Sequence, residues 1–165
     1  MAIDELTWSV ESERQIVRLL TRYCRLLDAG DMHALVPEIF SVDAIADYQG
    51  TIKTGRDEIE AYLQQYVPGY RLTSHLLSNV WIATCDENRA EVTSMLTAWH
   101  WWDQEDVDAG RKTNFTQVVQ NTDTMELTSE GWRIKKRHTQ GVGSLSALAD
   151  AILPPALNAK ATAQA

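Results

Sequence analysis

The dominant spacing of apolar residues along this chain changes near residue 70. Before that point, apolar side chains recur every three or four residues, which is the period of helices with one buried face. The helical segments predicted in this way are 11–27, 32–40 and 54–66, with a short strand pair at 42–48 and 51–53 between the last two. After residue 70 the period becomes two, which predicts long strands at 71–85, 89–103, 112–127 and 131–140.

This order of elements predicts an α+β fold, in which a strongly curved, mixed or antiparallel sheet wraps around the N-terminal helices. A length of 165 residues suits one domain, which we place at 11–153 between an N-terminal arm (1–10) and a loose Ala-rich tail (154–165). The segment 144–153 carries a last helical pattern and is a candidate lid over a pocket mouth.

Composition narrows the choice of partners and compartment. A net charge of −8 argues against a nucleic-acid partner, because phosphate binding needs a basic face. The basic residues between Arg133 and His138 are interpreted as the solvated face of a strand. No apolar run is long enough to cross a membrane and the acidic start lacks the features of a secretory signal, so a cytoplasmic protein is expected. Cys24 and Cys85 are expected to be buried as small hydrophobic residues.

Two acids at the end of the first helix differ in role. Asp31 precedes the second helix and suits an N-cap. Asp28 instead falls about 120° from the line through Ile16, at the edge of the apolar stripe. A carboxylate at such an edge needs a partner, because burying it unpaired costs several kcal/mol or raises its pKa.

His75, in the strand 71–85, is the candidate partner of Asp28. Strand alternation places His75 on one face with Leu77, Asn79 and Trp81. An imidazole oriented by a carboxylate is a general base suited to neutral pH. The same pair can equally be a buried structural contact, and the residues alone do not decide between the two.

Three further side chains are candidates for the same space. Tyr23 lies on the inward stripe of the first helix, and Tyr48 ends the first strand. His100 lies within a tryptophan-rich run (99–102) that either lines an apolar pocket or forms a subunit interface. The sequence contains no glycine-rich phosphate loop, no HExxH and no GxSxG motif, so it gives no support to a nucleotide, zinc-protease or serine-hydrolase site, and no metal is expected.

The chain resembles the SnoaL-like branch of the nuclear transport factor 2-like superfamily over roughly residues 10–140. The resemblance is carried by five segments in this order: 23–31, 46–48, 54–59, 73–75 and 131–134. It implies a cone made of a curved sheet around helices, with an apolar pocket inside. Within this superfamily the chain resembles lyases that need no cofactor, among them scytalone dehydratase, bile acid 7α-dehydratase and hexachlorocyclohexane dehydrochlorinase.

The resemblance implies that Asp28 and His75 form the catalytic dyad and that Tyr23 assists them. Tyr48 and His100 would contact substrate, although Leu27 stands where scytalone dehydratase has a tyrosine. We therefore expect a cofactor-independent lyase, of the dehydratase type, that acts on a small hydrophobic cyclic or aromatic molecule. The alternatives are an isomerase that uses the same dyad, or a non-catalytic ligand-binding or assembly subunit. A homodimer or homotrimer is expected.

Overall fold

The computed structural model describes residues 10–66 and 69–145. Its helices are α1 (Val10–Ala29), α2 (Met32–Ile39), α3 (Gly55–Tyr66) and α4 (Gln104–Asp108). Its strands are β1 (Phe40–Tyr48), β2 (Thr51–Thr54), β3 (Leu72–Cys85), β4 (Arg89–Trp101), β5 (Phe115–Thr128) and β6 (Gly131–Leu145). The predicted α+β class is confirmed. The predicted tail, the arm up to Ser9 and the candidate lid beyond Leu145 lie outside the described residues.

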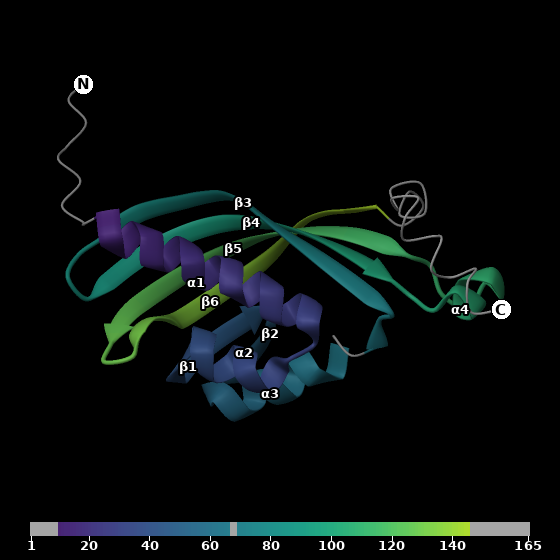
Figure 1. The fold of residues 1–165 in the computed structure, drawn as a ribbon, viewed down its shortest axis with the longest axis horizontal. Coiled ribbons are helices and arrows are strands. Elements are labelled where there is room, and N and C mark those ends of the chain that lie inside the picture. Colours follow the sequence, from purple (N-terminus) through teal and green to yellow (C-terminus); the bar gives the residue numbers. More distant parts are fainter. Residues whose placement is uncertain (1–9, 67–68, 146–165) are drawn as a thin grey trace, which may run out of the picture.

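The strands form one mixed sheet in the order β2-β1-β6-β5-β4-β3. Neighbouring strands are antiparallel except β1 and β6, which run parallel. The sheet curves around the N-terminal helices, with α1 lying along it and α2 and α3 next to β1 (Figure 1). Fully buried side chains from both layers meet in the core, among them Ile16 and Leu20 of α1 and Met125 and Ile134 of the sheet.

The end of α1 fixes where Asp28 lies. Gly30 has a φ of +69°, and the Asp31 N–H donates to the Leu26 carbonyl at 3.1 Å, which is the pattern that closes a helix with a left-handed glycine. Asp31 then caps α2 as predicted, because its carboxylate accepts the Ala34 N–H at 3.0 Å. Asp28 is thereby held in the last turn of α1, where that helix packs against β3.

A β-bulge in β6 changes the orientation of the basic cluster. Ile134 pairs with Met125 and Lys136 pairs with Thr124, so Lys135 is one residue more than the partner strand can match. The bulge reverses the alternation, and Arg137 points into the core with a side chain only 1% exposed. The prediction of a solvated strand face is therefore wrong for Arg137, although Lys136 and His138 are exposed as expected.

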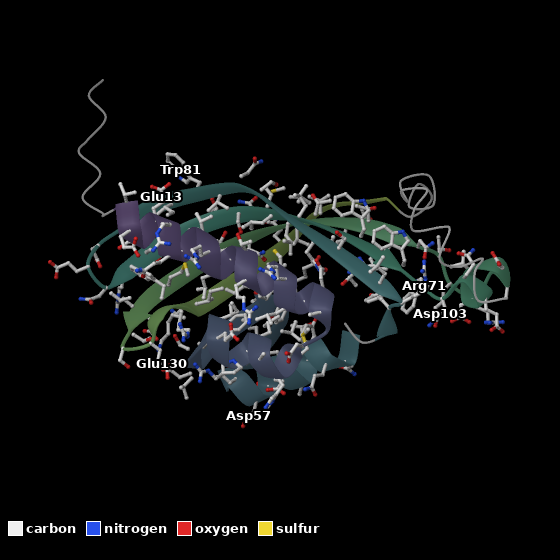
Figure 2. The ribbon with its side chains drawn as sticks, in the orientation of Figure 1. Glu13, Asp57, Arg71, Trp81, Asp103 and Glu130 are labelled. Carbon is white, nitrogen blue, oxygen red and sulfur yellow. The ribbon has the colours of Figure 1, made fainter. Side chains whose placement is uncertain are left out.

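A second bulge, in β3, separates His75 from Trp81. The register shifts between Ser78 and Trp81, and Asn79 has a positive φ of 48°. Trp81 is consequently 66% exposed and points away from the sheet (Figure 2), whereas the His75 side chain is 7% exposed. The prediction that His75 and Trp81 share a face is therefore wrong, because alternation does not survive a bulge.

The remaining differences are local. Residues 104–108, predicted as part of a loop, form the short helix α4, and β6 continues through the first two residues of the segment expected to be helical. Pro37 lies inside α2, which continues for two more residues to Ile39. Cys24 and Cys85 are free and buried, as predicted. Among the described residues, no helix is long and apolar enough to span a membrane.

Candidate active site

Asp28 and His75 meet where the last turn of α1 contacts the start of β3. His75 Nδ1 lies 2.6 Å from Asp28 Oδ1, and the His75 backbone N–H donates to Oδ2 at 3.1 Å. The Thr73 hydroxyl donates to Oδ1 at 3.0 Å. Three donors from one strand therefore fix the carboxylate, which in turn fixes the imidazole ring.

The protonation state of the pair follows from its hydrogen bonds. Burial alone would raise the pKa of Asp28, but the hydrogen bonds from His75 and Thr73 outweigh burial and leave that pKa below its ordinary value. The ionised carboxylate can only accept, so Nδ1 of His75 carries the proton in this contact. Nε2 makes no hydrogen bond to any residue in the described part of the chain and is the nitrogen left for a ligand.

A cavity of about 270 Å³ opens beside His75 between the helices and the sheet. Tyr23, Tyr48 and His100 line it together with His75, so the structure brings the predicted residues to one place. The other residues of the wall were not predicted from the sequence and combine apolar and polar groups: Leu27, Gln49, Tyr62, Leu63, Tyr70, Leu96, Ala98, Gln117, Val119, Asn121 and Thr139.

His100 forms an uncharged part of this wall. Its ring stacks on Phe115 at 4.4 Å between centroids and lies edge-on to His75 at 5.9 Å. Burial, followed by repulsion from His75, lowers the pKa of His100 to about 4. His100 is therefore neutral near pH 7, and its buried Nδ1 has no hydrogen-bond partner among the described residues.

Tyr23 and Tyr48 provide hydroxyl donors inside the cavity. Burial raises the pKa of both phenols, and the nearby Arg137 only partly opposes this effect, so both stay protonated at neutral pH. The Tyr48 ring stacks on Tyr62 at 4.7 Å, and its buried hydroxyl lacks a hydrogen-bond partner within the described residues. An oxygen atom of a bound molecule would satisfy that hydroxyl.

A buried ion pair behind Tyr23 was not predicted. Arg137 donates from Nε to Asp123 Oδ1 at 2.8 Å and from Nη2 to Oδ2 at 2.7 Å. Its guanidinium carbon lies 4.4 Å from the centre of the Tyr23 ring. One sequence signal was available, because Asp123 alternates with Val119 and Asn121 on the inward face of β5. The bulge at Lys135 hid the corresponding signal for Arg137.

A second hollow reaches the dyad from the other side. It has a volume of about 380 Å³, lies between α1 and β3, and is lined by Asp28 and His75 together with Cys24 and Leu76. The Asp28 side chain is 32% exposed. His75 therefore lies between the inner cavity and this outer hollow.

A search against protein families matches the model of the SnoaL-like domain over residues 8–138. The chain belongs to the SnoaL-like domain family. A search among curated proteins finds no match.

Solved structures agree with this SnoaL-like assignment. A candidate scytalone dehydratase from Novosphingobium aromaticivorans shares 25% identity with a TM-score of 0.74, covering 83% of this chain and 88% of that one. A hexachlorocyclohexane dehydrochlorinase of type 2 shares 14% identity with a TM-score of 0.74, covering 88% and 95%. A candidate dehydratase of the NTF2-like family from Streptomyces avermitilis shares 17% identity with a TM-score of 0.68, covering 80% and 97%. The dehydrochlorinase and the Streptomyces avermitilis protein are less than 25% identical to this chain, and their similarity shows a shared fold.

The tryptophan-rich run contributes only His100 to the cavity of this SnoaL-like protein. Trp101 is 4% exposed, and the Trp102 ring packs on Tyr70 at 4.4 Å with Lys112 above it at 3.9 Å. The three indoles therefore do not line the cavity, and a subunit interface at this run remains a prediction. Within residues 10–66 and 69–145, no group of three or more His, Cys, Asp or Glu side chains is arranged to hold a metal ion.

Proposed function

We propose that this SnoaL-like protein is a lyase that eliminates water from a small hydrophobic cyclic molecule. The observation that carries the proposal is the 2.6 Å contact between Asp28 and His75 beside a cavity of about 270 Å³. A base held by a carboxylate, next to a space lined by rings, suits the removal of a proton from carbon. The likeness to a candidate scytalone dehydratase at 25% identity supports this class of reaction.

The elimination uses residues already in place. His75 Nε2 takes a proton from carbon, the C–H electron pair becomes a carbon–carbon double bond, and the bond to the departing oxygen breaks. The oxygen leaves as water after receiving a proton from the imidazolium. Tyr23 and Tyr48 donate hydrogen bonds to substrate oxygen, where negative charge develops. Asp28 stabilises the charged imidazolium throughout, and general base catalysis of this kind contributes about 10²- to 10⁴-fold in rate.

Arg137 has a supporting part in this scheme. Its positive charge beside the Tyr23 ring stabilises negative charge that develops at the phenol or at an oxygen bound to it. The pairing with Asp123 holds the guanidinium in position.

The test is a panel of cyclic β-hydroxyketones, followed by mass spectrometry for loss of water. His75→Ala and Asp28→Asn should each lower turnover at least about tenfold. The chain offers a matched control in the surface pair His138 and Asp47, whose Nδ1 and Oδ2 atoms are 3.1 Å apart and which do not line the cavity. His138→Ala and Asp47→Asn should retain wild-type turnover.

Near wild-type turnover in both dyad variants would refute the assignment. Uptake of deuterium from solvent without loss of water would instead favour an isomerase, which needs the same base but no leaving group.

A further inference from the structure

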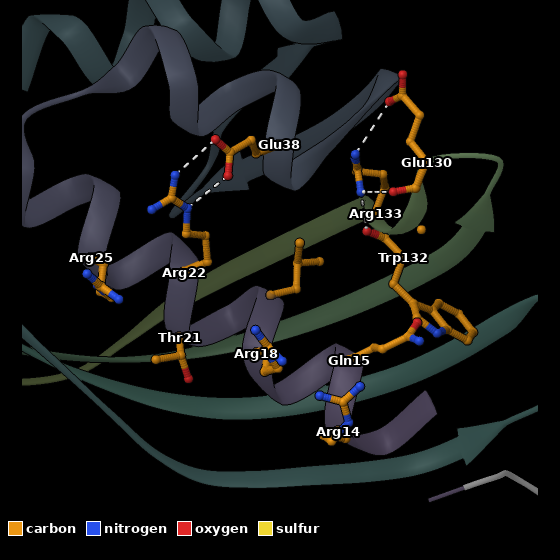
Figure 3. Close-up of a pocket in the computed structure, with 12 residues that line it drawn as sticks. Arg14, Gln15, Arg18, Thr21, Arg22, Arg25, Glu38, Glu130, Trp132 and Arg133 are labelled. Carbon is orange, nitrogen blue, oxygen red and sulfur yellow. Dashed lines mark hydrogen bonds and ion pairs between the residues drawn. The ribbon is translucent and has the colours of Figure 1, made fainter. Parts of the chain in front are cut away.

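A separate groove lies along the outer face of α1, next to α2 and the turn between β5 and β6 (Figure 3). Its volume is about 540 Å³, larger than that of the cavity beside His75. Five arginines line it: Arg14, Arg18, Arg22 and Arg25 of α1, and Arg133 of β6. We call it the arginine groove. Neither member of the dyad lines it, although Thr21 and Arg25 also line the outer hollow beside Asp28.

The concentration of arginine is unusual for this chain. The sequence contains ten arginines and five lysines, and half of the arginines but none of the lysines line this one groove. The chain as a whole carries a net charge of −8. Arginine differs from lysine in offering a planar fork that binds phosphate or carboxylate through two parallel hydrogen bonds.

Helix stability does not explain the stripe. The helix dipole acts within the first and last turns only, so it does not account for Arg14, Arg18 and Arg22, which lie between those turns of α1. The spacing of four residues from Arg14 to Arg18 and on to Arg22 places like charges next to each other, which destabilises a helix. A ligand of opposite charge would offset the repulsion between these neighbouring guanidinium groups.

Three of the five arginines are already positioned by acids. Arg14 pairs with Glu11 at 2.6 Å, and Arg22 binds both oxygens of Glu38 at 2.8 and 3.1 Å. Arg133 contacts Glu130 and donates to backbone carbonyls of the turn.

Arg18 and Arg25 are exposed and make no ion pair or hydrogen bond to the rest of the described chain. They are seven residues apart, so their backbones are about 10 Å apart along the helix. Arg18 and Arg25, which make no hydrogen bond or ion pair within the described residues, thus lie on either side of Arg22, whose guanidinium is held by Glu38.

We propose that the arginine groove binds a small organic molecule with two or more adjacent phosphoryl groups. A chain of phosphates matches a row of guanidinium forks, whereas a single phosphate reaches only part of the row. The groove is concave and of the size of a small-molecule site. A nucleic-acid strand fits less well, since Glu38 and Glu130 border the groove and the chain is acidic overall.

The test is calorimetric titration of the full chain with inorganic phosphate, inorganic tripolyphosphate and ATP at constant ionic strength. We expect saturable binding of tripolyphosphate that is at least about tenfold tighter than binding of phosphate, because each added charged hydrogen bond contributes roughly one power of ten or more. Equal affinity for ATP would show that the phosphate chain alone is recognised. Tighter binding of ATP would support the same site with a nucleotide as its ligand.

The double variant Arg18→Gln/Arg25→Gln should weaken tripolyphosphate binding at least about tenfold. Neither side chain makes a hydrogen bond or ion pair within the described structure, so folding should be retained, which circular dichroism would verify. The matched control is Arg89→Gln/Lys136→Gln, which removes the same charge from exposed positions outside the groove. It should change affinity by less than about twofold, because exposed charges at a distance are screened by salt.

Three results would overturn the proposal. The first is an absence of saturable binding by tripolyphosphate and ATP. The second is equal weakening in both double variants, which would mean that affinity follows net charge only. The third is a change of oligomeric state in Arg18→Gln/Arg25→Gln by sedimentation velocity without phosphate present, which would identify the groove as a contact between subunits.

Discussion

The ion pair between Arg137 and Asp123 provides a test that needs no substrate. Their side chains are 1% and 0% exposed, and two short hydrogen bonds join them. Asp123→Asn keeps the shape of the side chain but removes its charge, so the guanidinium would remain buried without a counterion. Breaking such a pair from one side costs about 3–5 kcal/mol.

The expected loss is large compared with a total stability of about 5–15 kcal/mol. For a chain of this size it corresponds to a fall in melting temperature of roughly 6–20 °C. Urea unfolding monitored by tryptophan fluorescence would measure it. Asp43→Asn is the matched control, because Asp43 pairs with Lys135 on the surface, is 72% exposed and should contribute nothing measurable.

A second variant separates loss of the pair from loss of packing. Arg137→Met/Asp123→Leu removes both charges, so no buried charge is left unpaired, and it should recover much of the stability lost in Asp123→Asn. An unchanged urea midpoint in Asp123→Asn would refute the reasoning. A double variant Arg137→Met/Asp123→Leu that is less stable than Asp123→Asn would also refute it.

Three further predictions concern titration and reactivity. Folding lowers the pKa of Asp28, so its ionised form stabilises the fold above about pH 4. This contribution is lost as the pH falls through the lowered pKa. The difference in urea midpoint between wild type and Asp28→Asn should therefore shrink over that pH range. Folding lowers the pKa of His100 to about 4, whereas the imidazole has its ordinary pKa of about 6.5 in the unfolded chain. Between these two pH values the unfolded chain binds a proton that the folded chain does not bind, and the free energy of unfolding falls. His100→Phe should therefore flatten the decline in stability between these two values, and an unchanged decline would contradict the burial argument. Burial raises the pKa of Cys24 to about 11, so iodoacetamide at pH 8 should modify this thiol only after urea is added. Rapid labelling of Cys24 in the folded chain would contradict this prediction and would show that α1 opens.

Much of the site was predictable because its residues follow regular periods. Asp28 and Tyr23 lie at positions that a straight helix assigns correctly, and His75 lies on β3 before its bulge. Arg137 and Trp81 were placed on the wrong faces because each follows an inserted residue that reverses the alternation. A bulge depends on pairing with the neighbouring strand, which the local sequence does not contain. The same reason applies to the parallel pairing of β1 with β6, whose partners are about 90 residues apart in sequence.

The position of His75 between two hollows has a consequence for how water reaches the dyad. The imidazole lines both hollows, while Asp28 lines only the outer one of the two. In the proposed elimination the imidazolium returns its proton to the departing oxygen, so the base is restored inside the cavity without exchange with solvent. Bulk water reaches the carboxylate from the outer hollow, so the charge of Asp28 follows the pH of the solution even while substrate or product fills the inner cavity.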